Sequence, residues 1–157
     1  ILEIKIKAIY LHCNQKGTYM YTEAKNKLLE FGISPSMQRL AIMDYMMNNH
    51  THPTVDVIYH DLIGSIPTLS KTTVYNTLKL FADHGAIQML TICEKNVRWD
   101  ERITPHAHFL CKECGKLLDV RYEAIFHKPE VIDGNVVSEV HIYYKGVCKD
   151  CKEKSGS

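Results

Sequence analysis

Four cysteines are arranged in two closely spaced pairs that could together bind one metal ion. Two residues separate Cys111 from Cys114 and Cys148 from Cys151, and 33 residues lie between the two pairs. Two intervening residues allow a tight turn to direct both sulfur atoms at the same ion, and four thiolates complete the closed tetrahedron that structural zinc prefers. We therefore predict that these four cysteines bind one structural Zn²⁺ ion.

Other interpretations of the paired cysteines are open. They could be unrelated reduced thiols or two redox pairs of the thioredoxin type, although neither pair lies in the β-α-β context that such redox motifs need. Bound zinc would add folding free energy to a small domain. Cys13 and Cys93 have no neighbouring cysteine, and we expect them to be ordinary thiols.

A second candidate metal site begins with His106 and His108, just before the first cysteine pair. Alternate residues of a strand point to the same face, so a strand here would place both imidazoles side by side. From spacing alone, two solvent-facing histidines explain the pattern equally well. Further nitrogen and oxygen ligands are available at His52, Asp100 and Asp119, but spacing does not bring them together.

The elements that must position these residues begin with helices in the first half of the chain. Apolar residues recur at helical spacing from Tyr21 to Gly32. Ser36, Thr54 and Ser70 are suitable N-caps for three further helices. In the helix after Ser36, the expected buried stripe consists of Leu40, Met43 and Met47.

The helix predicted after Ser70 has two contrasting faces and ends at Gly85. Val74, Leu78 and Phe81 share one face, which we expect to be buried. The opposite face is expected to be exposed and carries mostly polar side chains, namely Lys71, Thr72, Tyr75, Asn76 and Lys79. Such an exposed face is usually only solvated, so this pattern alone does not establish nucleic-acid binding.

Strand-like patterns follow this helix. Segments 86–92 and 96–101 predict a β-hairpin, and helices followed by a hairpin are typical of a winged helix-turn-helix. From about Pro105 the pattern changes to short strands, which indicates a second, α+β domain. The strands are predicted at 106–111, 116–120 and 136–148, with one possible helix at 122–127 and a polar tail at the end.

Composition excludes several classes of protein. Hydrophobic residues make up 45% of the chain and charged residues 24%, as in globular proteins and unlike disordered or fibrous ones. The longest apolar runs are far shorter than the roughly 20 residues that cross a bilayer. The first residues lack the pattern of a signal peptide. Six cysteines without a secretory signal favour a reducing cytoplasm.

The formal net charge is only +1, so the electrostatic signature of a DNA-binding protein is weak. Five segments nevertheless occur together in a specific order and jointly resemble the ferric uptake regulator family over roughly residues 22 to 152. They are HPTVDVIY at 52–59, LSKTTVYNTLKLFADHG at 69–85, VRWD at 97–100, HAHFLCKECGKLLDV at 106–120 and YKGVCKDC at 144–151.

This resemblance implies an α+β protein that represses transcription as a homodimer on double-stranded DNA. An N-terminal winged helix-turn-helix domain would precede a small α/β dimerisation domain that the zinc ion holds together. The implied divisions are an extension of unknown role at 1–19, a DNA-binding domain at 20–92, a hinge at 93–104, and a dimerisation and metal-binding domain at 105–157.

The resemblance also implies a regulatory Fe²⁺ or Mn²⁺ ion. Its ligands would be His52, Asp100, His106, His108 and Asp119. Such a mixed nitrogen and oxygen set suits iron or manganese, whereas four thiolates select zinc. The two aspartates and Asn76 resemble the peroxide-responsive branch of the family.

In that branch, peroxide oxidises a ligand histidine in the iron form, here His52 or His106, and repression ends when the ion leaves. An ion that bridges the two domains would set the distance between the recognition helices of a dimer, which must match the half-sites of a palindromic operator. Metal binding would then favour DNA binding through thermodynamic linkage.

The resemblance implies DNA contacts on the exposed helix face. Tyr75 could contact a thymine methyl group and Asn76 could pair with adenine, while Lys71, Thr72 and Lys79 could reach phosphates. Arg39, which is retained from the family pattern, is a further expected DNA-binding residue. The usual basic residue before the second helix is missing.

One further metal site of some members is not expected here, because Ala107 stands where those members have an acidic residue. His127 and His141 have no assigned role. The alternatives are a sensor of iron or zinc supply from the same family, a zinc-dependent hydrolase that uses His106 and His108, and a purely structural zinc-ribbon adaptor. No His-Glu-x-x-His motif supports the hydrolase.

Overall fold

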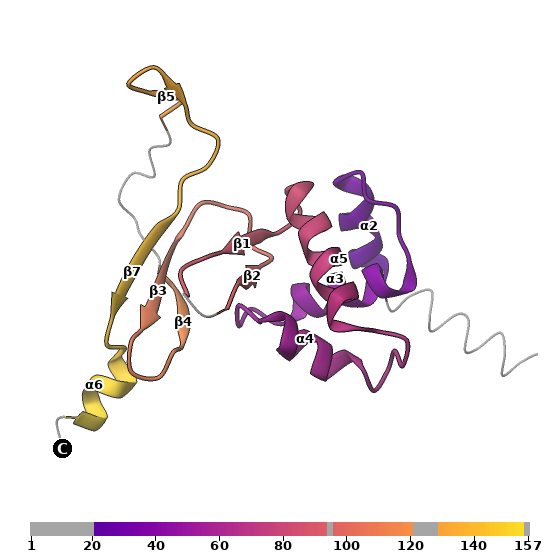
Figure 1. The fold of residues 1–157 in the computed structure, drawn as a ribbon, viewed down its shortest axis with the longest axis horizontal. Helices are drawn as coiled ribbons and strands as arrows, with labels where there is room; N and C mark the ends of the chain where they lie inside the picture. Colours follow the sequence, from indigo (N-terminus) through magenta and orange to yellow (C-terminus); the bar gives the residue numbers. More distant parts are fainter. Residues whose placement is uncertain (1–20, 94–95, 121–128, 156–157) are drawn as a thin grey trace, which may run out of the picture.

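The computed structural model describes residues 21–93, 96–120 and 129–155. The expected extension at 1–19, Cys13 and the possible helix at 122–127 lie outside these residues, as does His127. The chain has a helical half and a sheet half, which are connected through a small hairpin (Figure 1). Within the described residues, every helix is too short or too polar to cross a membrane.

The helical half contains the helices that the capping residues predicted. The side-chain oxygen of Ser36 accepts a hydrogen bond from the N–H of Arg39 at 3.4 Å, and Thr54 and Ser70 make equivalent bonds with the N–H groups three residues on. All three predicted N-caps are therefore confirmed. The helices are α2 (Thr22–Glu30), α3 (Met37–Asn48), α4 (Val55–Leu62) and α5 (Lys71–Asp83).

The buried faces of these helices form the larger hydrophobic core. In α5 the predicted buried residues Val74, Leu78 and Phe81 are fully enclosed. In α3 the prediction was only partly right, because Met43 is buried but Leu40 and Met47 are half-buried, and Ala41, Ile42 and Met46 lie deeper. The reason is that α3 contacts α2, α4 and α5, so a broad sector of its surface is covered rather than one stripe.

The predicted hairpin is present as strands β1 (Gln88–Leu90) and β2 (Arg98–Asp100), which pair antiparallel. Trp99 lies at the centre of β2 and is fully buried in the helical core. Its N–H donates to the carbonyl of Pro53 at 3.2 Å, which ties β2 to the loop between α3 and α4. The hairpin is thus packed against the helices as the wing of a winged helix-turn-helix.

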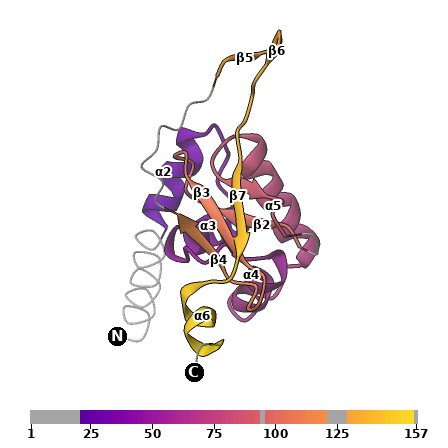
Figure 2. The same ribbon diagram turned by 90° about the vertical axis from the view of Figure 1, so that its left-hand side faces the viewer.

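The sheet half contains strands β3 (Ala107–Cys111), β4 (Leu117–Val120) and β7 (Ile142–Gly146). Their order is β4-β3-β7, with β3 antiparallel to β4 and parallel to β7. Figure 2 shows β3 and β7 side by side, with α6 (Lys149–Ser155) at the end of β7. Strands β5 (Val131–Ile132) and β6 (Asn135–Val136) form a small projecting hairpin.

Two expectations for the end of the chain were wrong. The strand predicted at 136–148 is shorter, because residues 138–141 form no strand and only Ile142–Gly146 pair with β3. Residues 149–155, whose last part was interpreted as a polar tail, form α6. Asp150 in its first turn and Lys152 and Lys154 in its last turn favour this helix, because their charges complement the helix dipole.

Replacing Leu78 by Ala tests the core of the helical half. Leu78 is 0% exposed, so the substitution removes buried methyl groups and leaves a cavity, which should lower the free energy of unfolding by about 2–5 kcal/mol. Chemical denaturation measures this change. Leu29→Ala is the matched control, because Leu29 is 54% exposed and its loss should change stability little; equal effects of the two substitutions would contradict the packing described.

Candidate metal centres

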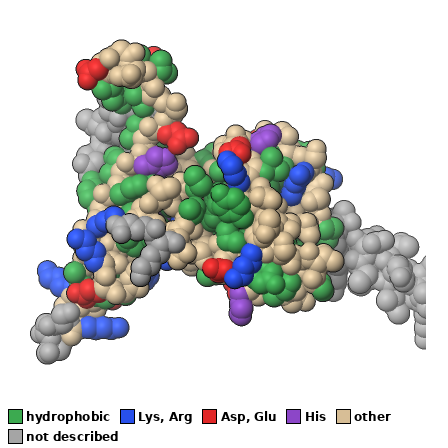
Figure 3. Space-filling model, in the orientation of Figure 1, with side chains coloured by type: hydrophobic (Ala, Val, Ile, Leu, Met, Phe, Trp, Pro, Cys, Tyr) green, Lys and Arg blue, Asp and Glu red, His purple; other side chains and the backbone are tan. Residues whose placement is uncertain are grey.

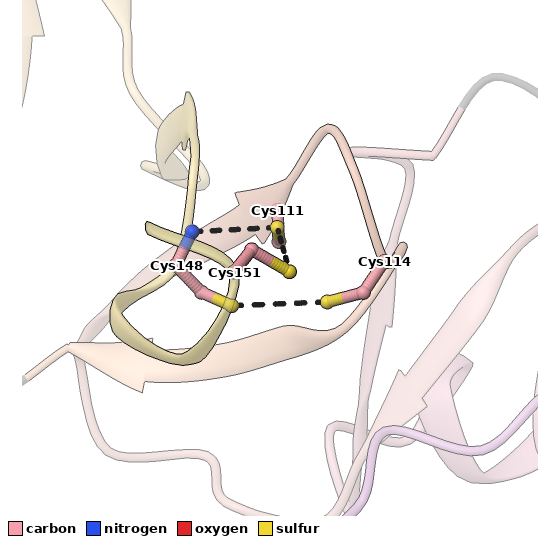
Figure 4. Close-up of side chains that lie close together, drawn as sticks. All are labelled: Cys111, Cys114, Cys148 and Cys151. Carbon is pink, nitrogen blue, oxygen red and sulfur yellow. Dashed lines mark hydrogen bonds between the residues drawn. The ribbon is translucent and has the colours of Figure 1, made fainter. Parts of the chain in front are cut away.

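The first candidate centre lies where β3 and β7 end together. Cys111 is the last residue of β3 and is paired in register with Gly146, two residues before Cys148. Cys114 lies in the turn after β3, and Cys151 lies one turn into α6. Because parallel neighbouring strands end at the same edge of a sheet, the two cysteine pairs meet there (Figure 4).

The spacing of the sulfur atoms matches a tetrahedral zinc site. Sγ of Cys111 lies 3.9 Å from Sγ of Cys151, and Sγ of Cys114 lies 3.8 Å from Sγ of Cys148. All four sulfur atoms lie within 4.8 Å of one another. Zinc–sulfur bonds of about 2.3 Å in a tetrahedron place the sulfurs about 3.8 Å apart. The four cysteines therefore fit one Zn²⁺ ion, and none of them forms a disulfide.

Backbone amides prepare this centre for thiolates. Hydrogen bonds from the N–H groups of Cys114 and Cys148 lower the pKa of the Cys111 thiol to about 6, and the Cys148 N–H lies 3.3 Å from this sulfur. The neighbouring thiols of Cys148 and Cys114 instead raise the pKa of Cys151. Four thiolates this close together repel one another, which disfavours the ionisation of all four. A divalent cation bound among them offsets this repulsion.

The second candidate centre lies between the two halves of the chain. Each of five residues places one ligand atom within 4.8 Å of the others, and they are the five that the family resemblance indicated: His52, Asp100, His106, His108 and Asp119. His52 lies in the loop before α4, and Asp100 ends β2. His106 immediately precedes β3, His108 is its second residue, and Asp119 lies in β4. The fold thus brings together ligands that spacing along the chain did not join.

Three local structures explain this gathering. The register of β3 and β4 sets Asp119 directly opposite His108. The bond from Trp99 to Pro53 brings Asp100 beside His52, and the Arg98 guanidinium also donates to the His52 carbonyl at 3.2 Å. His52 has a φ of 51°, a left-handed conformation that is uncommon outside glycine and is held here by these contacts.

The histidine nitrogens converge on one oxygen of each aspartate. Asp100 Oδ2 lies 3.0 Å from His106 Nε2, 3.3 Å from His108 Nε2 and 3.9 Å from His52 Nε2. Asp119 Oδ1 lies 2.8, 3.3 and 3.8 Å from the Nε2 atoms of His52, His106 and His108. Adjacent ligands about 2.1 Å from a common ion are about 3 Å apart. The five atoms therefore fit the ligand shell of one ion.

Burial and hydrogen bonding leave the histidine nitrogens available to a metal. Nδ1 of His106 lies 2.7 Å from the Thr104 carbonyl and must donate to it, so Nε2 carries the free lone pair. The buried Nε2 atoms of His52 and His106 make no hydrogen bond with any described residue, although carboxylate oxygens lie close to them. Unsatisfied buried polar atoms are costly, and a bound cation would satisfy them.

The ionisation of this cluster also suits a cation. Burial lowers the pKa of His52 and so favours the neutral imidazole that binds metals. Burial acts to raise the pKa of Asp100, but hydrogen bonds from His108 and from the N–H of Arg102 outweigh it and hold the pKa below its ordinary value. Asp100 is therefore a carboxylate at neutral pH.

Two cavities border the second centre. His106 and His108 line one of about 400 Å³, between the end of α5, Ile103 and Pro105, and the segment before β7. His52 and Asp119 line another of about 350 Å³. The His52 side chain is only 3% exposed, whereas that of Asp119 is 31% exposed, so Asp119 is the member of this pair that meets solvent.

The predicted DNA-contacting residues of α5, Lys71, Thr72, Tyr75, Asn76 and Lys79, are all exposed, as expected. Two of them already have partners, since Lys71 forms an ion pair with Asp56 and Lys79 forms one with Asp83 at 3.1 Å. The Tyr75 ring packs edge-on against the Trp99 ring, with 6.2 Å between the ring centroids. Exposed ion pairs are weak, so both lysines could exchange their partners for phosphates.

Arg39 and His141 have local partners. The Arg39 guanidinium donates to the carbonyl of Ser34 at 2.7 Å, so its side chain also stabilises the loop before α3. His141 lies 3.1 Å from Glu139 and is not part of either cysteine or histidine cluster. No role for His141 follows from this contact.

Sequence reasoning missed the residues that support the second centre. The Thr104 carbonyl orients His106, and the Arg102 N–H holds Asp100 at 3.0 Å. Arg102 also lies 3.7 Å from Asp119 through its guanidinium. Backbone donors and acceptors have no sequence signature, because every residue type supplies them.

Comparison with known proteins points to one family. The model of the ferric uptake regulator family matches residues 30–144. The peroxide operon regulator of Bacillus subtilis (strain 168) is 36% identical over 135 residues, which are 84% of this chain and 93% of that protein. The peroxide-responsive repressor PerR of Staphylococcus aureus (strain Mu50) is 36% identical over 137 residues, 84% of this chain and 91% of that protein.

Solved structures agree on the fold. The ferric uptake regulator Fur of Helicobacter pylori, described as having three functional metal binding sites, matches with a TM-score of 0.61 at 19% identity, over 85% of this chain and 92% of that chain. The ferric uptake regulator of Francisella tularensis with iron matches with a TM-score of 0.60 at 21% identity, over 78% and 97%. The predicted α+β fold, with its winged helix-turn-helix first, is confirmed.

Replacing Cys114 by Ser tests the first centre. The substitution removes one of four thiolates, so the protein should lose most of its bound zinc and the sheet half should unfold more easily. Zinc content after purification and thermal unfolding measure both effects. Cys93→Ser is the matched control, because Cys93 lies outside the cluster. Unchanged zinc content in Cys114→Ser would rule out the four-cysteine site.

Proposed function

Since the chain belongs to the ferric uptake regulator family, we propose that it is a metal-dependent, DNA-binding transcriptional repressor that senses peroxide. Members of this family are transcriptional regulators rather than enzymes, which sets the zinc-dependent hydrolase aside. The observation that carries the proposal is the five-residue cluster between the two halves of the chain.

The position of this cluster supports a regulatory role. His52 comes from the helical half, Asp100 from the wing, and His106, His108 and Asp119 from the sheet half. An ion bound to all five would hold the halves in one relative orientation. In a dimer, that orientation sets the distance between the two α5 helices and thereby the fit to DNA half-sites. Metal binding and DNA binding would then strengthen each other.

The two centres would bind different metals. We propose structural Zn²⁺ at Cys111, Cys114, Cys148 and Cys151, because four thiolates select zinc. The ligands of the second centre are three imidazoles and two carboxylates, which suit Fe²⁺ or Mn²⁺. Ligand type would thus sort the ions, and the structural ion would stay in place when the regulatory ion is exchanged.

Peroxide sensing is supported by the relatives, two of which are named as peroxide regulators at 36% identity. Bound ferrous iron supplies one-electron chemistry with hydrogen peroxide, whereas manganese does so far less readily. The residues proposed to be oxidised are His52 and His106, whose buried Nε2 atoms lie within 3.3 Å of Asp119 Oδ1. An oxidised imidazole is a poorer ligand, so the ion would leave and repression would end.

A homodimer is supported by exposed apolar residues in the sheet half. Figure 3 shows hydrophobic side chains gathered at the tip of the β5–β6 hairpin, where Val131, Ile132 and Val136 are 55%, 51% and 82% exposed. Val140, before β7, and Tyr144, within β7, are also exposed. Such surfaces commonly mark interfaces, and a second copy of the chain would cover them.

Several finer points belong to the same proposal. The operator would be palindromic double-stranded DNA, because a symmetric dimer presents two equivalent helices. The proposed domains are 20–92 for DNA binding, 93–104 as hinge and 105–157 for dimerisation and metal binding, and the proposed location is the cytoplasm. A sensor of iron or zinc supply is the alternative within the family, and the experiment below separates it.

Peroxide treatment tests the sensing proposal. The iron-loaded protein should dissociate from DNA and gain oxygen on peptides that contain His52 or His106. The manganese-loaded protein should stay bound to DNA, and its histidines should stay unmodified. Gel shifts on duplexes selected from a random pool by the manganese form, followed by peptide mass analysis, measure this. Peptides with the exposed His84, which Lys71 and Lys79 separate from His52 and Arg102 separates from His106, serve as internal control.

Different results would support the alternative. If peroxide does not release the iron-loaded protein from DNA, or releases it while its histidines stay unmodified, peroxide sensing through ligand oxidation is refuted. A requirement for Fe²⁺ or Zn²⁺ alone, with no effect of peroxide, would indicate a sensor of metal supply.

Replacing Asn76 by Ala tests the recognition face of α5. Loss of a paired amide at a base edge costs about 1–3 kcal/mol, so binding to the selected duplex should weaken about tenfold, with less effect on unrelated DNA. Gel shifts with the manganese-loaded protein measure the change. Asn26→Ala, on the exposed surface of α2, is the matched control. Equal affinities of both variants would exclude Asn76 from base recognition.

A further inference from the structure

One residue of the hinge, Arg102, contacts both carboxylates of the second centre. Its backbone N–H donates to Asp100 Oδ1 at 3.0 Å, and its guanidinium Nη1 lies 3.7 Å from Asp119 Oδ2. In each aspartate this is the oxygen that does not face the histidines, because the imidazoles lie closest to Asp100 Oδ2 and Asp119 Oδ1. Each carboxylate therefore has one oxygen directed at the cluster and one directed at Arg102.

Arg102 is itself held in place by neighbouring residues. Its Nε donates to Thr104 Oγ1 at 3.1 Å, and its carbonyl accepts from Gln88 Nε2 at 2.8 Å. Gln88 lies opposite Asp100 in the wing, so the pairing of β1 with β2 fixes the position of the Arg102 backbone. The Thr104 carbonyl accepts from His106 Nδ1 in turn. Residues 102–104 thus contact three of the five members of the cluster.

We propose that Arg102 is a positioning residue that restricts each aspartate to a single ligand oxygen, so that five protein atoms bind the regulatory ion. The inference rests on the metal site proposed above. Carboxylates bind cations through one or both oxygens, and a hydrogen bond to the second oxygen, as in Asp100, or an ion pair with it, as in Asp119, disfavours the two-oxygen mode. An ion held by these five protein atoms alone is five-coordinate, and the remaining position of an octahedron stays open to a small molecule such as peroxide.

The charge of Arg102 has a second effect on the site. The Arg102 side chain is 47% exposed, so solvent screens its charge, yet its guanidinium remains a cation beside a carboxylate that would bind a divalent ion. Its repulsion of that ion would weaken binding modestly. Removing the side chain should therefore both free Asp119 Oδ2 and tighten the binding of divalent ions, whereas the bond from the backbone N–H to Asp100 would stay.

The variant Arg102→Met tests the proposal in the full-length protein with its zinc retained. Co²⁺ in the second centre reports ligand number, because five-coordinate cobalt absorbs visible light more strongly than six-coordinate cobalt. Arg102→Met should show weaker absorption per bound Co²⁺ and bind Mn²⁺ about threefold to tenfold more tightly. Arg102→Lys, which keeps a cation for Asp119, should stay close to the unchanged protein in both measurements.

Lys25→Met is the matched control, because it removes one exposed cation from α2, outside the second centre. An unchanged cobalt spectrum in Arg102→Met would overturn the restriction of Asp119, even if Mn²⁺ affinity rose through charge alone. Weaker Mn²⁺ binding would overturn it too. If the unchanged protein bound neither Co²⁺ nor Mn²⁺ beyond its zinc, the proposed metal site would fail instead, so the two failures are distinguishable.

Discussion

The backbone hydrogen bond from Trp99 to Pro53 determines much of this structure. Trp99 is buried in the helical core, so its strand is anchored there, and the bond holds the loop of His52 against that strand. Asp100, the next residue, is thereby placed beside His52. Together with the bond from the Arg98 guanidinium to the His52 carbonyl, this anchor places the ligand that the helical half contributes to the second centre.

Strand β3 connects the two metal centres. His108 lies within it and Cys111 ends it, three residues apart, so both centres depend on the same strand and on its pairing with β4 and β7. Zinc at the cysteine centre would fix the ends of β3 and β7. The histidine centre would then have ligands from this sheet on one side and from β2 and the loop before α4 on the other.

The second centre combines burial with incomplete hydrogen bonding. Four of its members are buried, namely His52, Asp100, His106 and His108, and the Nε2 atoms of His52 and His106 make no hydrogen bond with any described residue. A protein interior tolerates such atoms when a ligand satisfies them. Arg102 and Thr104 form hydrogen bonds with the atoms of Asp100 and His106 that point away from the other ligands. The remaining ligand atoms of these two residues therefore face the centre of the cluster.

The amino-acid sequence by itself determined the local features: the N-caps at Ser36, Thr54 and Ser70, the buried face of α5 and the two cysteine pairs. These follow from spacing within one turn or one helix, which is visible along the chain. Spacing did not join His52, Asp100 and Asp119 to His106 and His108; the family resemblance indicated this set, and the tertiary structure brings its ligand atoms together. Only the tertiary structure decided that α3 is covered on several sides and that Arg102 contacts both carboxylates. These depend on strand register, on packing between helices and on backbone atoms that every residue shares, so spacing along the chain does not encode them.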